Sequence, residues 1–186
     1  MGDESHNRRL RRILLKACAL MTAQAVAAPV CAGPLRPQVR SLAFVQTHTG
    51  ERRTITYWEH GRYLPEGLVQ INHMFRDHYN DQVAVIDPAL VDLLHRLAQR
   101  LDTRKPLHII SAYRSAATNE RLHQRSSGVA KRSLHMDGKA IDIRIPGHDL
   151  KQVHRAALSL KGGGVGLYTR SQFVHIDVGR LRQWGA

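Results

Sequence analysis

The sequence has little cysteine, few aromatic residues and no apolar run long enough to form a stable membrane span. Cysteine occurs only at Cys18 and Cys31, in or beside an apolar N-terminal stretch, so the rest of the 186-residue chain has no disulfide framework and no thiolate metal site. Any metal must therefore be held by histidine and carboxylate side chains. Aromatic residues make up only 5% of the chain, and the apolar stretch is too short and too rich in alanine to span a bilayer.

Positive charge is abundant. The chain has 28 Lys and Arg against 15 Asp and Glu, a formal net charge of +13. This excess alone would suit nucleic acid or another polyanion. However, the basic residues are spread along the whole chain, and no basic run is interleaved with aromatics. Nucleic acid is therefore not expected as a partner.

The first 32 residues have the organisation of an export signal. Five basic residues between Arg8 and Lys16 precede an alanine-rich apolar run over Ala17–Ala32. Arg11 and Arg12, followed by apolar residues and Lys16, resemble a twin-arginine export motif. We therefore expect a signal peptide at 1–32, no stable membrane insertion after its removal, and one folded domain at 33–186. The alternative is a basic N-terminal arm on a cytosolic protein.

Apolar periodicity in the remaining chain predicts strands near both ends, with helices inserted between them. The predicted strands are Ser41–Gln46, Arg53–Trp58, Leu107–Ile110, Ala140–Ile145, Val165–Tyr168 and Phe173–Val178. The predicted helices are Pro65–Tyr79, Pro88–Leu101, Thr118–Gln124 and Asp149–Lys161. The segment Ser126–Lys139 is polar and predicted to be a surface loop. This order indicates an α+β fold with a small, mostly antiparallel sheet and flanking helices.

Three potential metal ligands occur in or beside these predicted strands. Asp142 lies between Ile141 and Ile143, and His175 lies between two apolar residues of the last predicted strand. A buried carboxylate without a partner is costly, so Asp142 must face solvent or a partner. If adjacent strands place Asp142 beside His175, and the polar loop supplies His135, two histidines and one carboxylate would surround an open position. Catalytic zinc sites have this composition.

Three motifs resemble those of the zinc D-Ala-D-Ala peptidase superfamily, also called the LAS type. The segment from Ser133 to Asp142 matches Ser-x-His-x-x-Gly-x-Ala-x-Asp, Ser111–Ser115 matches Ser-x-Tyr-Arg-Ser, and His175 supplies the late histidine. Further similarity to the murein endopeptidases of Gram-negative bacteria extends over nearly the whole chain. The resemblance implies a hedgehog/D-Ala-D-Ala peptidase-like fold and a periplasmic location reached by the twin-arginine route.

The same resemblance implies the roles of individual residues. One zinc ion would be bound by His135, Asp142 and His175. Arg114 would bind the substrate or stabilise the tetrahedral intermediate, a role that suits its permanently charged, forked guanidinium group. Ser133 would bind substrate or order its loop.

One position departs from the family pattern. Many relatives have an acidic general base three residues before the last histidine ligand, and Gln172 occupies that position here. Glutamine cannot accept the proton of a water molecule. Asp177 lies two residues after His175, on the same face of a regular strand. Asp177 could therefore be the catalytic base, or it could orient His175.

The resulting expectation is a periplasmic zinc metallopeptidase that hydrolyses peptide cross-links of peptidoglycan. The bond would lie either between D-alanine and diaminopimelate or between two diaminopimelate residues. One alternative is a carboxypeptidase that removes terminal D-alanine. The other, which the presence of Gln172 suggests, is a zinc-containing cell-wall-binding module without turnover.

Overall fold

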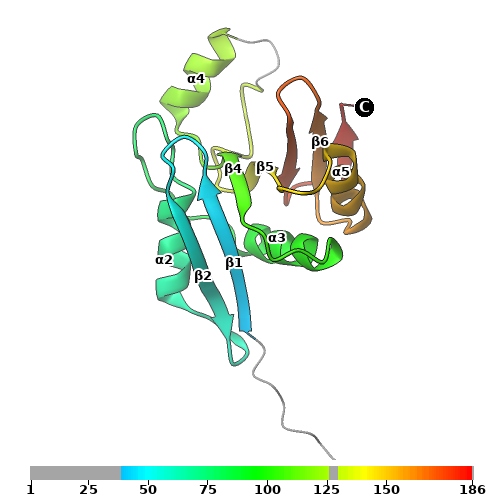
Figure 1. Cartoon of the computed structure of the whole chain (residues 1–186). Coiled ribbons are helices and arrows are strands. Elements are labelled where there is room, and N and C mark those ends of the chain that lie inside the picture. Colours follow the sequence, from blue (N-terminus) through cyan, green and yellow to red (C-terminus); the bar gives the residue numbers. More distant parts are fainter. Residues whose placement is uncertain (1–38, 126–129, 186) are drawn as a thin grey trace, which may run out of the picture. The chain divides into compact units, whose positions relative to one another are not determined.

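The computed structural model describes residues 39–125 and 130–185 (Figure 1). The strands are β1 (Val39–Gln46), β2 (Arg52–Glu59), β3 (Arg62–Tyr63), β4 (Leu107–Ser111), β5 (Ala140–Arg144), β6 (Gly164–Tyr168), β7 (Phe173–Asp177) and β8 (Arg182–Trp184). The helices are α2 (Pro65–Met74), α3 (Pro88–Arg100), α4 (Ala116–Arg125) and α5 (Leu150–Ser159). This order confirms the predicted α+β class. The predicted signal peptide at 1–32 and its boundary with the domain at 33–186 lie outside the described residues.

One mixed sheet contains all eight of these strands, in the order β3-β2-β1-β4-β5-β7-β6-β8. Its β1–β4 and β6–β8 pairs are parallel, and the other neighbouring pairs are antiparallel. The sheet is therefore mostly antiparallel, as predicted. The strands β5 and β7, which carry two of the expected ligands, are neighbours in its interior.

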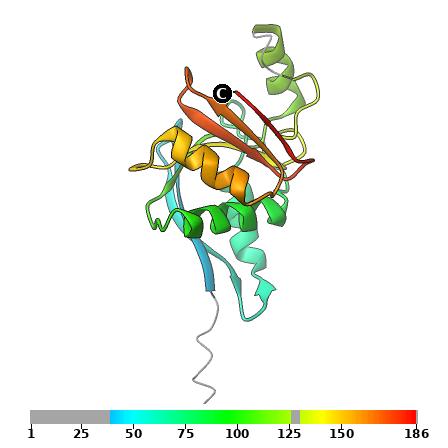
Figure 2. The same ribbon diagram turned by 90° about the vertical axis from the view of Figure 1, so that its right-hand side faces the viewer.

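The hydrophobic core lies where α2, α3 and α5 pack against the sheet. Helix α3 begins as its sequence predicts, with the Asp87 side chain accepting a hydrogen bond from the Ala89 amide at 2.9 Å. Its leucines at 90, 94 and 97 are completely buried, and burial of each contributes about 1.5–3 kcal/mol to stability. Helices α3 and α5 lie side by side (Figure 2). Within the described residues, no helix is both long and apolar enough to cross a membrane.

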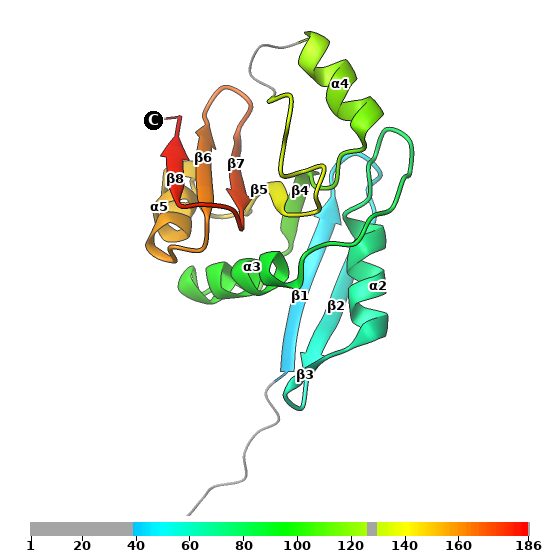
Figure 3. The ribbon, with the colours of Figure 1, turned by 180° about the vertical axis from the view of Figure 1, so that it is seen from behind.

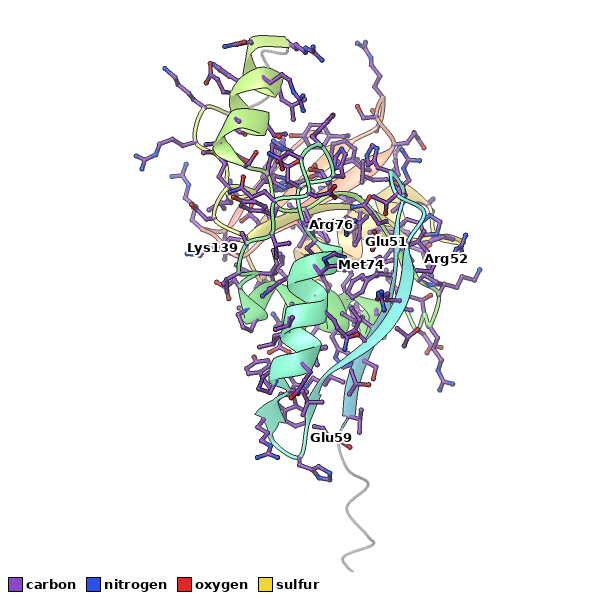
Figure 4. All side chains as sticks on the ribbon, turned by 90° about the vertical axis from the view of Figure 1, so that its left-hand side faces the viewer. Glu51, Arg52, Glu59, Met74, Arg76 and Lys139 are labelled. Carbon is purple, nitrogen blue, oxygen red and sulfur yellow. The ribbon has the colours of Figure 1, made fainter. Side chains whose placement is uncertain are left out.

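Helix α2 is shorter than predicted: it ends at Met74 and does not reach Tyr79. After it, the chain turns so that the guanidinium of Arg76 pairs with Glu51, which lies between β1 and β2 (Figure 4). The same guanidinium pairs with Asp81 at 2.9 Å. Arg76 is 8% exposed, and a buried cation requires such partners. These ion pairs replace the last helical turn that the apolar spacing had predicted.

The two shortest strands, β3 and β8, were not predicted. Helix α4 is longer than predicted by two residues at its start and one at its end, and it lies apart from the helices that cover the core (Figure 3). The predicted loop after it has no regular secondary structure over residues 130–139. This loop leads directly into β5 and carries His135.

Candidate metal centre

Antiparallel pairing of β5 and β7 places Asp142 directly opposite His175. Their neighbours Ile141, Ile143 and Val174 belong to the hydrophobic core. Because successive side chains of a strand point to opposite faces, Asp142 and His175 lie on the face away from that core. They are nevertheless only 5% and 8% exposed. This confirms the predicted juxtaposition of the two residues.

The loop before β5 places His135 over the same face. Its backbone forms a compact turn in which the amides of Gly138 and Met136 donate to the carbonyls of His135 and Ser133, respectively. Gly138 has a φ of +65°, and a Cβ there would overlap the backbone carbonyl of Val85. Only glycine fits this turn without strain. The turn leaves His135 only 3% exposed.

The three potential ligand atoms converge on one point. Nε2 of His135 lies 3.2 Å from Nδ1 of His175, and that nitrogen lies 2.9 Å from Oδ1 of Asp142. The distance from Nε2 of His135 to Oδ1 of Asp142 is 3.4 Å. Metal–ligand distances of about 2.0–2.1 Å in a tetrahedral zinc site separate the ligand atoms by about 3.3 Å. The donor set and its spacing therefore fit a metal ion.

The remaining nitrogen of each imidazole has its own partner. Nδ1–H of His135 donates to the carbonyl oxygen of Ala112 at 2.6 Å. Nε2–H of His175 donates to Oδ2 of Asp177 at 3.0 Å. Such partners fix the ring orientation and the tautomer of a metal-binding histidine. In both residues, the nitrogen left free is the one that points towards the cluster.

Burial and charge set the protonation of the three ligands. Burial lowers the pKa of His135, which keeps this ring neutral and able to bind a metal. Burial alone would raise the pKa of Asp142, but the adjacent His135 and His175 hold it below its usual range. Burial alone would lower the pKa of His175, but Asp142 and Asp177 raise it above its ordinary value. A metal cation would compete with that proton.

Asp177 is completely buried and has an unusually full set of donors. Besides His175, its carboxylate accepts hydrogen bonds from the amides of Gly164 at 3.0 Å and Gly179 at 2.8 Å. Arg182 binds both carboxylate oxygens, at 3.1 and 2.6 Å. Burial alone would raise the pKa of Asp177, but these donors hold it well below its usual range. The carboxylate therefore stays ionised, with its oxygens occupied.

Arg114 lies beside the three ligands. Its Nη2 atom is 3.8 Å from Oδ2 of Asp142, and its guanidinium makes long hydrogen bonds to Asn119 and Ser111 at 3.4 and 3.3 Å. The side chain is 11% exposed. Within the described part of the chain, its buried Nε–H has no acceptor. Arg114 thus has unused donor capacity at the edge of the metal centre.

A cavity of about 210 Å³ opens onto these residues. His135, Asp142, His175, Arg114 and Ser133 all line it. The Ser133 hydroxyl also accepts a long hydrogen bond, 3.4 Å, from the amide of His135. The structure thus brings together five of the six predicted site residues around one opening, with Asp177 buried behind them.

Gln172 does not take part in this site. It is exposed, and its side-chain amide donates to the carbonyl of Thr169 at 2.6 Å. It is absent from the described residues that line the cavity, and Asp142 is the only carboxylate among them. The Gln172 side chain thus contributes nothing to the lining of this cavity.

Sequence reasoning missed several residues that shape the site. Asn119 is 2% exposed and joins α4 to the ligand-bearing loop, because its amide nitrogen donates to the carbonyls of Ala130 and Lys131 at 3.2 Å. Arg182 and Trp184 enter from β8, which has too few residues for a periodic pattern. The one local signal for the role of Asn119 is that it follows Arg114 by only five residues in the sequence.

Comparisons with known proteins agree with these observations. The family model described as peptidoglycan L,D-endopeptidase MepK matches residues 35–184. The peptidoglycan L,D-endopeptidase MepK of Escherichia coli strain K12 is 42% identical over 174 residues, which cover 94% of this chain and 96% of that protein. The probable peptidoglycan L,D-endopeptidase MepK of Haemophilus influenzae is 39% identical over 149 residues, 80% of each chain. No solved structure shows significant similarity. The superfamily resemblance predicted from the motifs is confirmed: this chain belongs to the MepK family of peptidases.

Proposed function

We propose that this protein is a zinc-dependent murein endopeptidase that hydrolyses peptide cross-links of peptidoglycan. The observation that carries the proposal is the convergence of His135 Nε2, Asp142 Oδ1 and His175 Nδ1 within 3.4 Å of one another. These atoms lie at a cavity that Arg114 also lines, in a chain of the MepK family.

Two imidazole nitrogens and one carboxylate oxygen are one of the ligand sets that catalytic zinc sites use, with a further position left open. When bound in such a site, zinc supplies an acidified water molecule and polarises the substrate carbonyl. The roles of His135, Asp142 and His175 are to hold the ion and to keep its open side towards the cavity. The hydrogen bonds of both rings to Ala112 and Asp177 support this role, because they hold the rings in the required tautomers.

Arg114 is proposed to bind the oxygen on which negative charge develops during hydrolysis. Its guanidinium is permanently charged, mostly buried and close to Asp142. Charged donors in such partly dry sites stabilise a developing oxyanion more strongly than water does. Ser133 lines the same cavity and is proposed to contact the substrate peptide.

Asp177 is proposed to orient His175 and not to act as the general base. Its oxygens already accept hydrogen bonds from four residues, and it does not line the cavity. A base must be within hydrogen-bond reach of the proton that it removes. Asp177 is therefore suited to holding the His175 ring in place, and it lies outside the cavity in which a proton would have to be removed.

The protein is proposed to act in the periplasm after export through the twin-arginine route and removal of residues 1–32. The basic residues that precede the apolar stretch support this route. The anionic groups of peptidoglycan also suit a chain with a formal charge of +13.

Digestion of purified sacculi by the zinc-loaded protein tests the proposal. An endopeptidase converts cross-linked dimers into monomers, which chromatography of the muropeptides resolves. His135→Ala should abolish this conversion, whereas His73→Ala, at an exposed position on α2, should not. Removal of terminal D-alanine without loss of dimers would instead identify a carboxypeptidase. Binding to sacculi without any product would identify a non-catalytic module.

A further inference from the structure

Aromatic side chains gather on one side of the metal centre. Tyr168, Phe173 and Trp184, hereafter the aromatic cluster, all line the 210 Å³ cavity. They are three of only ten aromatic residues in the chain. Each is half-buried and none belongs to the hydrophobic core. Half-exposed aromatic surface next to a reactive centre is typical of a binding site.

The position of Trp184 is fixed by three neighbours. Strand β8 pairs with β6 so that Trp184 lies opposite Gly166, and a Cβ at Gly166 would lie 2.6 Å from Cζ2 and Nε1 of the indole. The ring therefore rests on the glycine backbone. Its Nε1–H donates to the hydroxyl of Tyr168 at 2.9 Å, and its centroid lies 5.1 Å from that of the His175 ring.

The other two members extend this surface. Tyr168 stacks on Phe173 with ring centroids 4.5 Å apart and an interplanar angle of 23°. The guanidinium of Arg182, held by Asp177, lies 5.0 Å from the Trp184 centroid. The aromatic cluster is thus a fixed apolar surface that begins beside a proposed metal ligand.

Apart from Ala130 and Leu134, the remaining lining of the cavity is polar or charged. Arg114, Arg132 and Ser133 line it, and Arg132 is exposed. A ligand that fills this cavity would therefore meet flat apolar rings and guanidinium groups together. A linear methylene chain that ends in a carboxylate can contact both the aromatic rings and the guanidinium groups. The methyl side chain of D-alanine would contact only a small part of the rings.

We infer that the aromatic cluster is a specificity-determining subsite that binds the methylene chain of a diamino-diacid residue next to the scissile amide. Arg132 binds the carboxylate of the same residue. This inference rests on the proposed endopeptidase function. It assigns to Trp184 the discrimination between cross-links that join two diaminopimelate residues and cross-links in which D-alanine precedes the scissile bond. Differences of one methylene in an apolar pocket correspond to about 10–200-fold in kcat/KM.

The test compares two purified cross-linked dimers, one of each type, as substrates of the zinc-loaded protein. In Trp184→Ala, kcat/KM for the diaminopimelate–diaminopimelate dimer should fall at least about tenfold, with little change for the D-alanine dimer. Trp58→Ala is the matched control, since Trp58 lies in β2 and does not line the cavity. It should leave the ratio of the two kcat/KM values unchanged. If Trp184→Ala leaves this ratio unchanged, whether or not both kcat/KM values fall, the inference is overturned.

A binding measurement covers the case in which Trp184→Ala does not fold. The chain has two tryptophans, so Trp58→Phe leaves Trp184 as the only indole. With His135→Ala added to prevent turnover, titration with the diaminopimelate–diaminopimelate dimer should change the tryptophan fluorescence in a saturable way. An absent change, or the same affinity for the D-alanine dimer, would contradict the inference.

The two proposals fail in different ways. If the wild-type protein with zinc cleaves neither dimer, the endopeptidase function is wrong, and the fluorescence titration still decides whether the aromatic cluster binds the methylene chain. If the wild type cleaves dimers but Trp184→Ala retains the wild-type ratio, only the assignment of the subsite is wrong.

Discussion

Replacement of Asp177 by asparagine separates the two roles that its position allows. The carboxylate is fully buried and binds His175, Arg182 and two backbone amides. Asparagine keeps one acceptor oxygen, but it removes the charge and turns an NH2 group towards donors. Breaking a buried ion pair on one side costs about 3–5 kcal/mol. For a chain of this length, that corresponds to a fall in Tm of roughly 6–20 °C.

The effect on the metal centre follows from the hydrogen bond to Nε2 of His175. Loss of such a partner lowers metal affinity by about 10–100-fold. If Asp177 only orients His175, saturating zinc should restore kcat to within a few-fold of wild type. Zinc affinity is measured by competition with a chelator, and kcat by release of monomers from cross-linked dimers at increasing zinc concentration.

A matched control is Asp102→Asn, which makes the same chemical change at an exposed position and should alter neither quantity. The positioning role would be refuted if Asp177→Asn kept wild-type zinc affinity but lost about 100-fold or more in kcat at saturating zinc. That loss is of the size expected when a general base is removed.

Three further predictions concern other parts of the fold. Asn119→Ala removes an acceptor of Arg114 and two bonds to the ligand-bearing loop, so kcat/KM should fall about tenfold while zinc affinity, measured by chelator competition, stays unchanged. Gly67→Ala places a Cβ 2.8 Å from Cα of Tyr57, so the free energy of unfolding, measured by thermal unfolding, should fall by about 1–3 kcal/mol. Glu66→Ala, at an exposed position, is the neutral control. Burial, with the stacked His48 adding repulsion, lowers the pKa of His78 from its ordinary 6.5 to about 4. The unfolded chain therefore binds the extra proton first, and stability should decrease as pH falls from about 6.5 to about 4. Urea unfolding of the metal-free protein at several pH values should show that the free energy of unfolding depends less on pH in His78→Gln than in the wild type. The same pH dependence in both proteins would contradict this assignment to His78.

The apolar periodicity of the sequence was sufficient to predict the helices and strands that bury a regular apolar face. The alternation around Asp142 and His175 predicted that both lie off the core face, and the register of β5 and β7 confirms that they are adjacent. The predicted start of α3 at Pro88 is confirmed, because the Asp87 cap and the proline that follows it act within a few residues. In both cases the deciding interactions lie close together in the sequence or repeat along it.

Long-range contacts decided what the sequence could not indicate. The end of α2 depends on the pairing of Arg76 with Glu51, which is 25 residues away. Strand β8 is only three residues long, and its pairing depends on the space above Gly166 that the indole of Trp184 fills. The aromatic cluster therefore could not be recognised before the register of β6 and β8 was known.

The measurement that tests the central claim most directly is the release of monomeric muropeptides from sacculi during metal removal and return. We expect release to stop when the metal is chelated with EDTA, to recover with about one equivalent of zinc, and to be absent in His135→Ala at any zinc concentration. Undiminished release by the metal-free protein, or by His135→Ala, would contradict the account of His135, Asp142 and His175 as a catalytic zinc centre.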